Sequence, residues 1–152
     1  MEDNNKVSFT NERIERYIEK LEHFKSYMKN LENWIKDIGK KDFLAINLKD
    51  QFAIYHAFQL SVEIITDLIA MTVKDLKIKP RDDYANIRYL KETKFLSEEL
   101  TESLKKMNGL RNVIVHDYNG IDELLAFKGI KTNIRTMKDF YEVMREWLRK
   151  NS

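Results

Sequence analysis

The stretch FAIYHAFQLSVEIITDLIAMTV, residues 52–73, decides the fold class of this chain. Its apolar side chains cover almost every side of a helix, and such a helix is buried on most sides. The polar exceptions recur every three or four residues and therefore share one face: His56, Gln59, Glu63 and Asp67. Burying this polar stripe without partners would cost on the order of 1–3 kcal/mol per group, so it must face water, a partner or a site.

Two histidines, His56 and His23, stand in different settings. His56 is either a core or interface histidine that Gln59 or a neighbouring chain satisfies, or it lines a polar cleft with the rest of the stripe. His23 lies among charged residues, which is typical of a solvated surface histidine. Neither setting by itself predicts a catalytic role.

Helical patterns continue on both sides of the buried stretch. The buried helix is expected over about 42–77, since Pro80 cannot continue a helix. Residues 122–125 begin a helical turn that Gly129 is expected to loosen. From apolar spacing and caps, the other predicted helices cover 11–38, roughly 81–91, a segment from Ser97 to Asn119 and Gly120, and a last helix through 134–148. These elements predict an all-α bundle with one or two long helix pairs.

The composition fits one helical domain and excludes several other classes of protein. The chain has 152 residues, which is enough for a self-sufficient core. Four glycines and one proline argue against a turn-rich β fold. The absence of cysteine excludes disulfides, thiol catalysis and zinc bound by cysteine, and it suits a reducing compartment such as the cytoplasm.

The distribution of charge argues against a membrane protein and leaves nucleic-acid binding undecided. No stretch of about 18 residues lacks a charged side chain, so no membrane-spanning segment is expected. The polar residues 1–6 lead into no apolar run, which is unlike a signal peptide. The net charge of +2 is too small to indicate RNA binding, so any RNA contact would need a local basic patch.

The spacing of the histidines and glycines predicts no metal and no cofactor. No histidine has Glu or Asp three residues before it, as the helices of a carboxylate di-metal bundle require. The His-Glu-x-x-His motif is absent as well. The glycines stand alone, so the chain has neither a glycine-rich phosphate loop nor a dinucleotide fingerprint.

A second stretch, RNVIVHDY at residues 111–118, holds the densest set of reactive side chains. Arg111 offers a fork of donors that matches phosphate oxygens, and His116 can transfer a proton near neutral pH. The two residues are five apart, about 140° around a helix, so they do not share a face. The alternative interpretation is a helix end with a surface arginine and a capping histidine.

Cleaving RNA without a metal sets a further requirement on this motif. The reaction needs a base for the 2′-hydroxyl and an acid for the leaving oxygen, and one such histidine per chain is too few. A symmetric dimer that places two His116 side chains opposite each other would supply both groups. The motif is therefore expected to be half of a site that a second copy completes.

Residues 110–122, LRNVIVHDYNGID, resemble the HEPN superfamily, specifically the HepT-like (DUF86) toxins. The resemblance covers most of the chain, and Arg-x4-His-x-Tyr is its specific part. It implies that residues 1–152 form a single HEPN-like helical domain, an up-and-down bundle of four to five helices, which forms a homodimer. The paired motifs of such a dimer form a metal-independent endoribonuclease. The usual partner is a minimal nucleotidyltransferase (MNT) antitoxin, which neutralises the toxin by adding AMP to the motif tyrosine.

Position by position, the resemblance implies roles for four residues. Arg111 would hold phosphate, and His116 would transfer the proton. Tyr118 would carry the modified hydroxyl, and Asn112 would orient the site. Asp117 stands where relatives often have glycine and adds negative charge beside an RNA site.

Three functions remain open at the level of the sequence. The first is a HepT-like ribonuclease toxin that acts on RNA as a homodimer. The second is a non-catalytic HEPN module that binds nucleotide or partners a minimal nucleotidyltransferase. The third is a structural helical dimer in which the motif is incidental.

Overall fold

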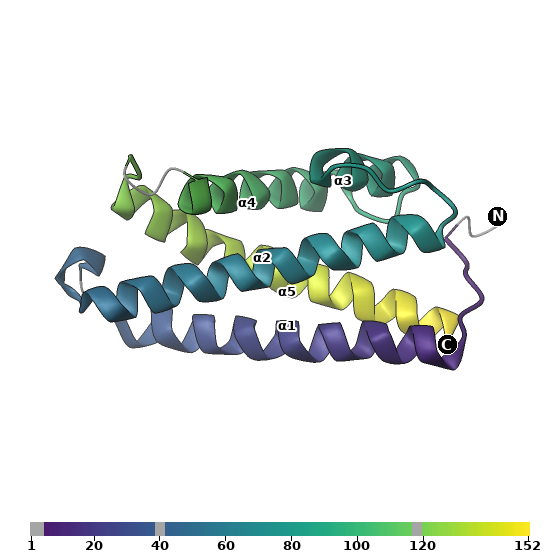
Figure 1. Ribbon diagram of the computed structural model, residues 1–152, viewed down its shortest axis with the longest axis horizontal. Helices are drawn as coiled ribbons and strands as arrows, with labels where there is room; N and C mark the ends of the chain where they lie inside the picture. Colours follow the sequence, from purple (N-terminus) through teal and green to yellow (C-terminus); the bar gives the residue numbers. More distant parts are fainter. Residues whose placement is uncertain (1–4, 39–41, 117–119) are drawn as a thin grey trace.

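Helix α2, Leu48–Asp75, is the central element of the fold and contacts α1, α3 and α4. The computed structural model describes residues 5–38, 42–116 and 120–152 (Figure 1). Every regular element in these ranges is helical: α1 (Asn11–Ile38), η1 (Phe43–Ala45), α2, α3 (Asp83–Glu92), α4 (Glu98–His116) and α5 (Glu123–Asn151). The predicted all-α fold class is confirmed.

The long helices run alternately up and down the bundle (Figure 1). α1 packs along α2, and α5 contacts both α1 and α4. The largest fully buried side chains fill the space between these helices, among them Tyr17, Phe24, Phe58, Leu68 and Phe140. This close-packed interior fixes the register of α2 against α4, the two helices that carry the candidate site.

Polar side chains cap α1 and α4 where the sequence predicts that these helices begin. Ser97 Oγ accepts a hydrogen bond from the Leu100 backbone N–H at 3.1 Å, as expected for the cap of α4. Thr10 Oγ1 accepts from the Arg13 N–H at 3.2 Å and caps α1 in the same way. The predicted span of α1, 11–38, is confirmed.

The predicted helix over 42–77 is wrong at both ends. Asp42 and Asn47 each accept a hydrogen bond from the backbone N–H two residues further on, at 3.0 and 2.8 Å. The first of these caps begins the 3-10 turn η1 and the second begins α2, so the segment is divided. α2 ends at Asp75, because Lys77 takes the left-handed conformation, at φ 66°, that commonly closes a helix.

The loosening expected at Gly129 is also wrong, because α5 continues through this residue. A Cβ atom at Gly129 would lie 2.7 Å from Leu110 Cδ2 of α4. The glycine therefore allows a close approach of α5 to α4, which offsets its low helix propensity. Leu110 directly precedes Arg111, so this contact lies beside the motif.

α2 is less completely buried than its composition predicts. Most of its apolar residues line the core, but Phe52 is 60% exposed. By length and composition alone α2 could cross a membrane, and that is weak evidence, since the core helix of a soluble protein meets the same criterion. The composition of α2 by itself therefore does not exclude a membrane-spanning helix, contrary to the expectation from the sequence. The contacts of α2 with three other helices are those of a core helix.

Candidate functional site

Arg111 reaches from α4 across to α2. Its Nη2 lies 3.4 Å from Glu63 Oε1, and its Nη1 donates to Asn112 Oδ1 at 3.0 Å. The side chains of Arg111 and Glu63 are 22% and 39% exposed, so the pair lies at the edge of the interface between the helices. A single carboxylate contact of this length holds a guanidinium less firmly than a bidentate pair does.

The guanidinium of Arg111 keeps donors that the chain does not use. Its Nε is buried and has no hydrogen-bond partner among the described residues. A guanidinium carries five N–H donors in a fork that matches the oxygens of a phosphate. Nη1 and Nη2 each use one of their two hydrogens among the described residues, and the side chain is 22% exposed, so an anion that docks at its exposed edge can meet the remaining Nη donors.

The polar stripe of α2 lies at the edge of the bundle, as predicted. Gln59 Nε2 donates to Glu63 Oε1 at 3.0 Å, and Asp67 pairs with a lysine of α1 at 3.4 Å. His56 is exposed, so the interpretation of a core histidine within this chain is wrong. Through Glu63, the stripe contacts Arg111 and so becomes part of the candidate site.

His116 is the last residue of α4 and is exposed. Within the described part of the chain, no hydrogen bond or ion pair joins it to Arg111. This agrees with the spacing, which places the two side chains on different faces of the helix. The predicted modification site Tyr118 lies outside the described residues, as do Asp117 and the predicted helix stop at Asn119.

The contact between Glu63 and Arg111 was not expected from the sequence. The stripe and the motif are both visible there, but they lie 48 residues apart. A signal for the contact does exist, because a carboxylate on an otherwise apolar, half-buried helix requires a cation or water. The sequence does not say which cation the fold supplies.

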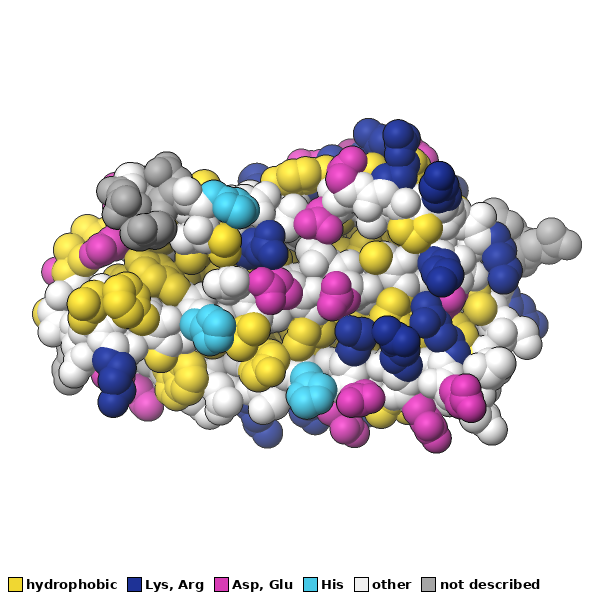
Figure 2. All heavy atoms as spheres, viewed as in Figure 1, with side chains coloured by type: hydrophobic (Ala, Val, Ile, Leu, Met, Phe, Trp, Pro, Cys, Tyr) yellow, Lys and Arg dark blue, Asp and Glu magenta, His cyan; other side chains and the backbone are white. Residues whose placement is uncertain are grey.

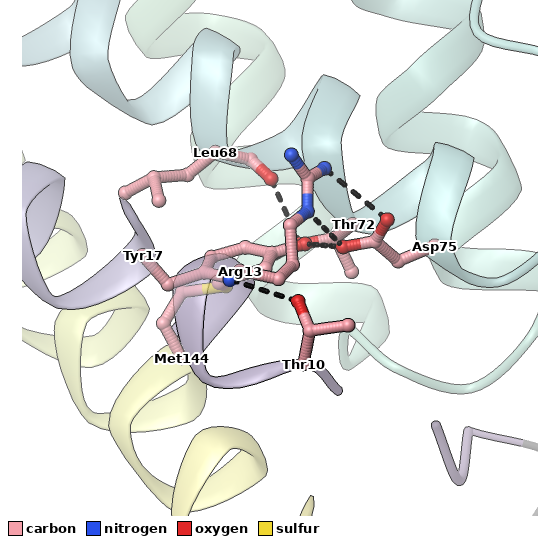
Figure 3. A network of polar contacts seen from close by, with 7 residues as sticks. All are labelled: Thr10, Arg13, Tyr17, Leu68, Thr72, Asp75 and Met144. Carbon is pink, nitrogen blue, oxygen red and sulfur yellow. Dashed lines mark hydrogen bonds and ion pairs between the residues drawn. The ribbon is translucent and has the colours of Figure 1, made fainter. Parts of the chain in front are cut away.

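A second arginine–carboxylate pair lies at the C-terminal end of α2, about three turns beyond Glu63 (Figure 3). Arg13 Nε and Nη2 donate to the two oxygens of Asp75 at 2.9 and 3.1 Å, and the Tyr17 hydroxyl donates to Asp75 Oδ2 at 2.5 Å. Burial, and then the hydrogen bond to Asp75, raise the pKa of Tyr17 above its ordinary value. The hydrogen bond to Asp75 raises the pKa of Arg13 as well. Because the carboxylate is fully engaged, this cluster stabilises the fold and does not resemble a binding site.

The rest of the described surface offers weaker candidates for a reactive site. A cavity of about 410 Å³ between α1 and α2 is lined by Trp34, Asp37, Ile38, Ile46, Asp50, Ala53 and Ile54, none of which belongs to the motif. Among the described residues, no group of three or more His, Asp or Glu could hold a metal ion. Histidine side chains lie over α1, α2 and α4 on one face of the molecule (Figure 2).

Comparison with known proteins identifies relatives of the chain. Residues 14–144 match a family model described as ribonuclease HepT-like. A protein of Archaeoglobus fulgidus named "Putative RNase" is 34% identical over 138 residues, which are 91% of this chain and 97% of that protein. The mRNA nuclease HepT of Shewanella oneidensis is 26% identical over 66 residues, which are 43% of this chain and 50% of that protein.

A solved structure shares the fold at lower sequence identity. It is the tri-AMPylated HEPN toxin of Shewanella oneidensis in complex with an MNT antitoxin. Its TM-score is 0.75 at 22% identity, over 90% of this chain and 99% of that chain. The family match over most of the sequence and the relative at 34% identity show that this chain belongs to the HepT-like ribonuclease family and has the fold of a HEPN toxin.

Proposed function

We propose that this chain is the ribonuclease toxin of a toxin–antitoxin pair and cuts RNA without a metal ion. The observation that carries the proposal is the placement of Arg111, whose side chain is 22% exposed and meets Glu63 of α2 in a single contact of 3.4 Å. The exposed His116 follows five residues later on the same helix, about 7.5 Å further along its axis. An RNA backbone bound at Arg111 and running along α4 would extend to this proton-transfer group.

The proposed reaction assigns one proton to each of two histidines. His116 of one copy takes the proton of the ribose 2′-hydroxyl as its oxygen attacks the neighbouring phosphorus. His116 of the second copy gives a proton to the 5′-oxygen, which leaves as its bond to phosphorus breaks. Arg111 stabilises the negative charge that develops on the phosphate. Since each chain supplies one His116, the complete site needs a homodimer.

One end of the bundle offers an apolar surface for the second copy. Exposed large apolar side chains gather where α1 ends and where η1, α2 and α5 begin: Trp34, Leu44, Leu48, Phe52, Leu124 and Leu125. We call this surface the end patch (Figure 2). η1 contacts α5, and the Phe43 and Phe127 rings stack at 4.5 Å, so these segments are neighbours. An apolar patch of this kind is typical of an interaction surface.

The end patch lies next to the motif, which supports the second copy as its occupant. α5 begins seven residues after His116, so the patch and the end of α4 are close along the chain. A two-fold contact through the patch would therefore bring the two motifs toward each other. The composite site needs this arrangement.

The proposed antitoxin is a minimal nucleotidyltransferase that adds AMP to Tyr118. Tyr118 stands two residues after His116. The HEPN toxin of Shewanella oneidensis, which has the same fold, is tri-AMPylated and bound to an MNT antitoxin. An AMP group beside His116 would add bulk and negative charge where RNA has to bind, and this would block the site. Both activities would take place in the cytoplasm.

Glu63 favours one alternative function. Its carboxylate contacts the arginine that would hold the phosphate. This suits a non-catalytic HEPN module that binds nucleotide or partners a minimal nucleotidyltransferase. His116 discriminates between the two functions, because only the ribonuclease needs it to move a proton.

RNA cleavage in EDTA tests the proposed activity. The purified chain should cut RNA, and the His116→Ala variant should be slower by at least about 100-fold with an unchanged unfolding midpoint. His23→Ala is the matched control, since His23 is also exposed but lies on α1, and it should cleave like the wild type. Wild-type cleavage by His116→Ala would refute the ribonuclease proposal. Cleavage that needs added Mg²⁺ would refute its metal-independent part.

The mass of the protein in solution tests the second copy. Light scattering should give a dimer for the wild type and a monomer for Phe52→Glu, because a buried unpaired charge opposes association. The monomeric variant should also lose cleavage. Lys49→Glu, a charge change at a neighbouring exposed position, should remain dimeric. A dimeric and active Phe52→Glu would show that the end patch is not the interface.

Modification by the partner is tested by mass spectrometry. Co-expression with the proposed nucleotidyltransferase should add the mass of AMP to the wild-type chain. Tyr118→Phe should remove this addition, whereas Tyr84→Phe, at an exposed tyrosine of α3, should keep it. Addition of AMP to Tyr118→Phe would contradict Tyr118 as the modified residue.

A further inference from the structure

A continuous chain of polar contacts runs from α2 to α4 through the arginine of the motif. Gln59 Nε2 donates to Glu63 Oε1 at 3.0 Å, and the same oxygen lies 3.4 Å from Arg111 Nη2. Arg111 Nη1 donates in turn to Asn112 Oδ1 at 3.0 Å. The guanidinium is thus held from two sides, by a carboxylate on one helix and by an amide on its own helix.

Glu63 stands in this chain despite an electrostatic disadvantage for RNA binding. A carboxylate and a phosphate accept the same hydrogen bonds, so Glu63 competes with phosphate for the donors of Arg111. Its negative charge also repels the RNA backbone. Because Glu63 is only 39% exposed, solvent and salt screen this repulsion only in part. A carboxylate at this position therefore weakens RNA binding, so its presence calls for another contribution to the reaction.

Glu63 can contribute the direction in which the guanidinium points. An arginine side chain has many rotamers, and its catalytic value depends on holding one of them. The contact with Glu63 is single and longer than those of the bidentate Arg13–Asp75 pair. It is thus suited to orient Arg111 and still yield to a phosphate.

We propose that Glu63 is a positioning residue for Arg111. By fixing the guanidinium, Glu63 raises the rate of the chemical step and lowers the affinity for RNA. This rests on the proposed ribonuclease function and deepens it. Gln59 supports the arrangement by fixing the carboxylate oxygen that faces Arg111. Neither residue transfers a proton or contacts the reacting atoms.

Steady-state kinetics of Glu63→Gln tests the proposal. Removing the charge should lower KM by about 3–10-fold, because the competing carboxylate is gone. It should also lower kcat by about 10-fold or more, because the guanidinium loses its orientation. A merely structural role would not move the two constants in the same direction. A kcat within about twofold of the wild type would overturn the proposal.

Asp67→Asn is the matched control. Asp67 belongs to the same stripe, one turn further along α2, and pairs with Lys20 of α1 instead of Arg111. The substitution removes the same charge, so KM and kcat should stay within about twofold of the wild type. Equal effects of Asp67→Asn and Glu63→Gln would show a general charge effect and would overturn the proposal. Gln59→Ala keeps the carboxylate, so it should lower kcat by about threefold without lowering KM.

A binding measurement separates failure of this proposal from failure of the proposed function. If the wild-type chain does not cleave RNA, the ribonuclease proposal fails, and affinity for a 2′-O-methyl RNA oligonucleotide becomes the readout. Glu63→Gln should still bind about 3–10-fold more tightly than the wild type, and Arg111→Ala should bind far more weakly. Unchanged affinity in Glu63→Gln, with an unfolding midpoint like that of the wild type, would overturn the role of Glu63.

Discussion

The arginines of the two arginine–carboxylate pairs are buried to similar degrees, but their contacts with the carboxylates differ. The side chains of Arg13 and Arg111 are 25% and 22% exposed. Arg13 makes two short bonds to Asp75, which accepts a third from a tyrosine, whereas Arg111 makes one contact of 3.4 Å with Glu63. Burial of the arginine itself therefore does not distinguish a structural arginine from a candidate functional one. The geometry of the carboxylate contact does: it is bidentate at Arg13 and single at Arg111, whose buried Nε has no partner among the described residues.

The difference follows from what surrounds each pair. Arg13 lies beside an aromatic cluster in which Tyr17 packs edge-on against Phe9 and Trp147 at 5.5 and 5.7 Å. The start of α1, the end of α2 and the end of α5 meet there, so few other arrangements are available. Arg111 lies at the edge of the interface between α2 and α4, where its side chain is 22% exposed. Its geometry is accordingly open to a ligand.

The largest expected contrast between the two pairs is in cleavage rate. Arg111→Ala should lower kcat/KM for RNA by about 100–1000-fold, because the charge on the phosphate loses its stabilising donors. For Arg13→Ala, kcat/KM for RNA should stay within about threefold of the wild-type value at a temperature where the variant is folded. Single-turnover assays of both variants measure this. Similar losses in the two variants would mean that the pairs do not differ in function.

The second contrast is in stability. Asp75→Asn leaves Arg13 without its charged partner and should lower the free energy of unfolding by about 2–3 kcal/mol. Glu63→Gln should lower it by less than about 0.5 kcal/mol, since a single long contact with a carboxylate that is 39% exposed contributes little. Urea unfolding followed by circular dichroism gives both values. Equal destabilisation by the two substitutions would place Glu63 among the structural residues.

The helices follow from the sequence, whereas the breaks and crossings between them do not. The apolar spacing predicts the span of α1, and Ser97 predicts the start of α4, because both signals are local. The turn between Asp42 and Asn47 was missed, since two short caps compete there with a continuous helical pattern. Gly129 was misinterpreted because its role is a contact with another helix.

The same distinction holds for the candidate site. Arg111 and Asn112 are neighbours in the sequence, and their hydrogen bond is local. Glu63 meets Arg111 only because the core sets the register between α2 and α4. No local pattern records that register. The roles of Arg111, Asn112 and His116 in catalysis and of Tyr118 as the modified residue remain predictions.

The third contrast is the coupling within each pair. A double-mutant cycle with Arg13→Ala and Asp75→Ala should give a coupling free energy of about 1–2 kcal/mol, because the pair is bidentate and largely shielded from solvent. The cycle with Arg111→Ala and Glu63→Ala should give less than about 0.5 kcal/mol. Both cycles use free energies of unfolding measured in the same buffer. A coupling free energy in the Arg111–Glu63 pair as large as in the Arg13–Asp75 pair would contradict the interpretation that the Arg111 pair is open to a ligand.

The smallest expected effect concerns the hydroxyl that completes the Arg13–Asp75 pair. Tyr17→Phe removes one hydrogen bond and should lower the free energy of unfolding by about 1 kcal/mol at pH 8. In the folded chain the pKa of Tyr17 is raised above the ordinary value of 10.0. The unfolded chain therefore releases this proton first, so the stability that the neutral hydroxyl contributes is present below about pH 10 and is lost as the pH rises above it.

The pH dependence of that small effect distinguishes the two pairs more sharply than its size does. One pH unit above 10, the wild type should have lost about 1.4 kcal/mol that Tyr17→Phe cannot lose, so the difference between them should fall to near zero at pH 11. Glu63→Gln should differ from the wild type equally at pH 8 and pH 11, because no phenol takes part in that pair. Urea unfolding of the three proteins at both pH values tests this. A Tyr17→Phe difference that persists unchanged at pH 11 would mean that the hydroxyl is not bound to Asp75 as a donor, and the Arg13–Asp75 pair would then be less completely satisfied than its geometry indicates.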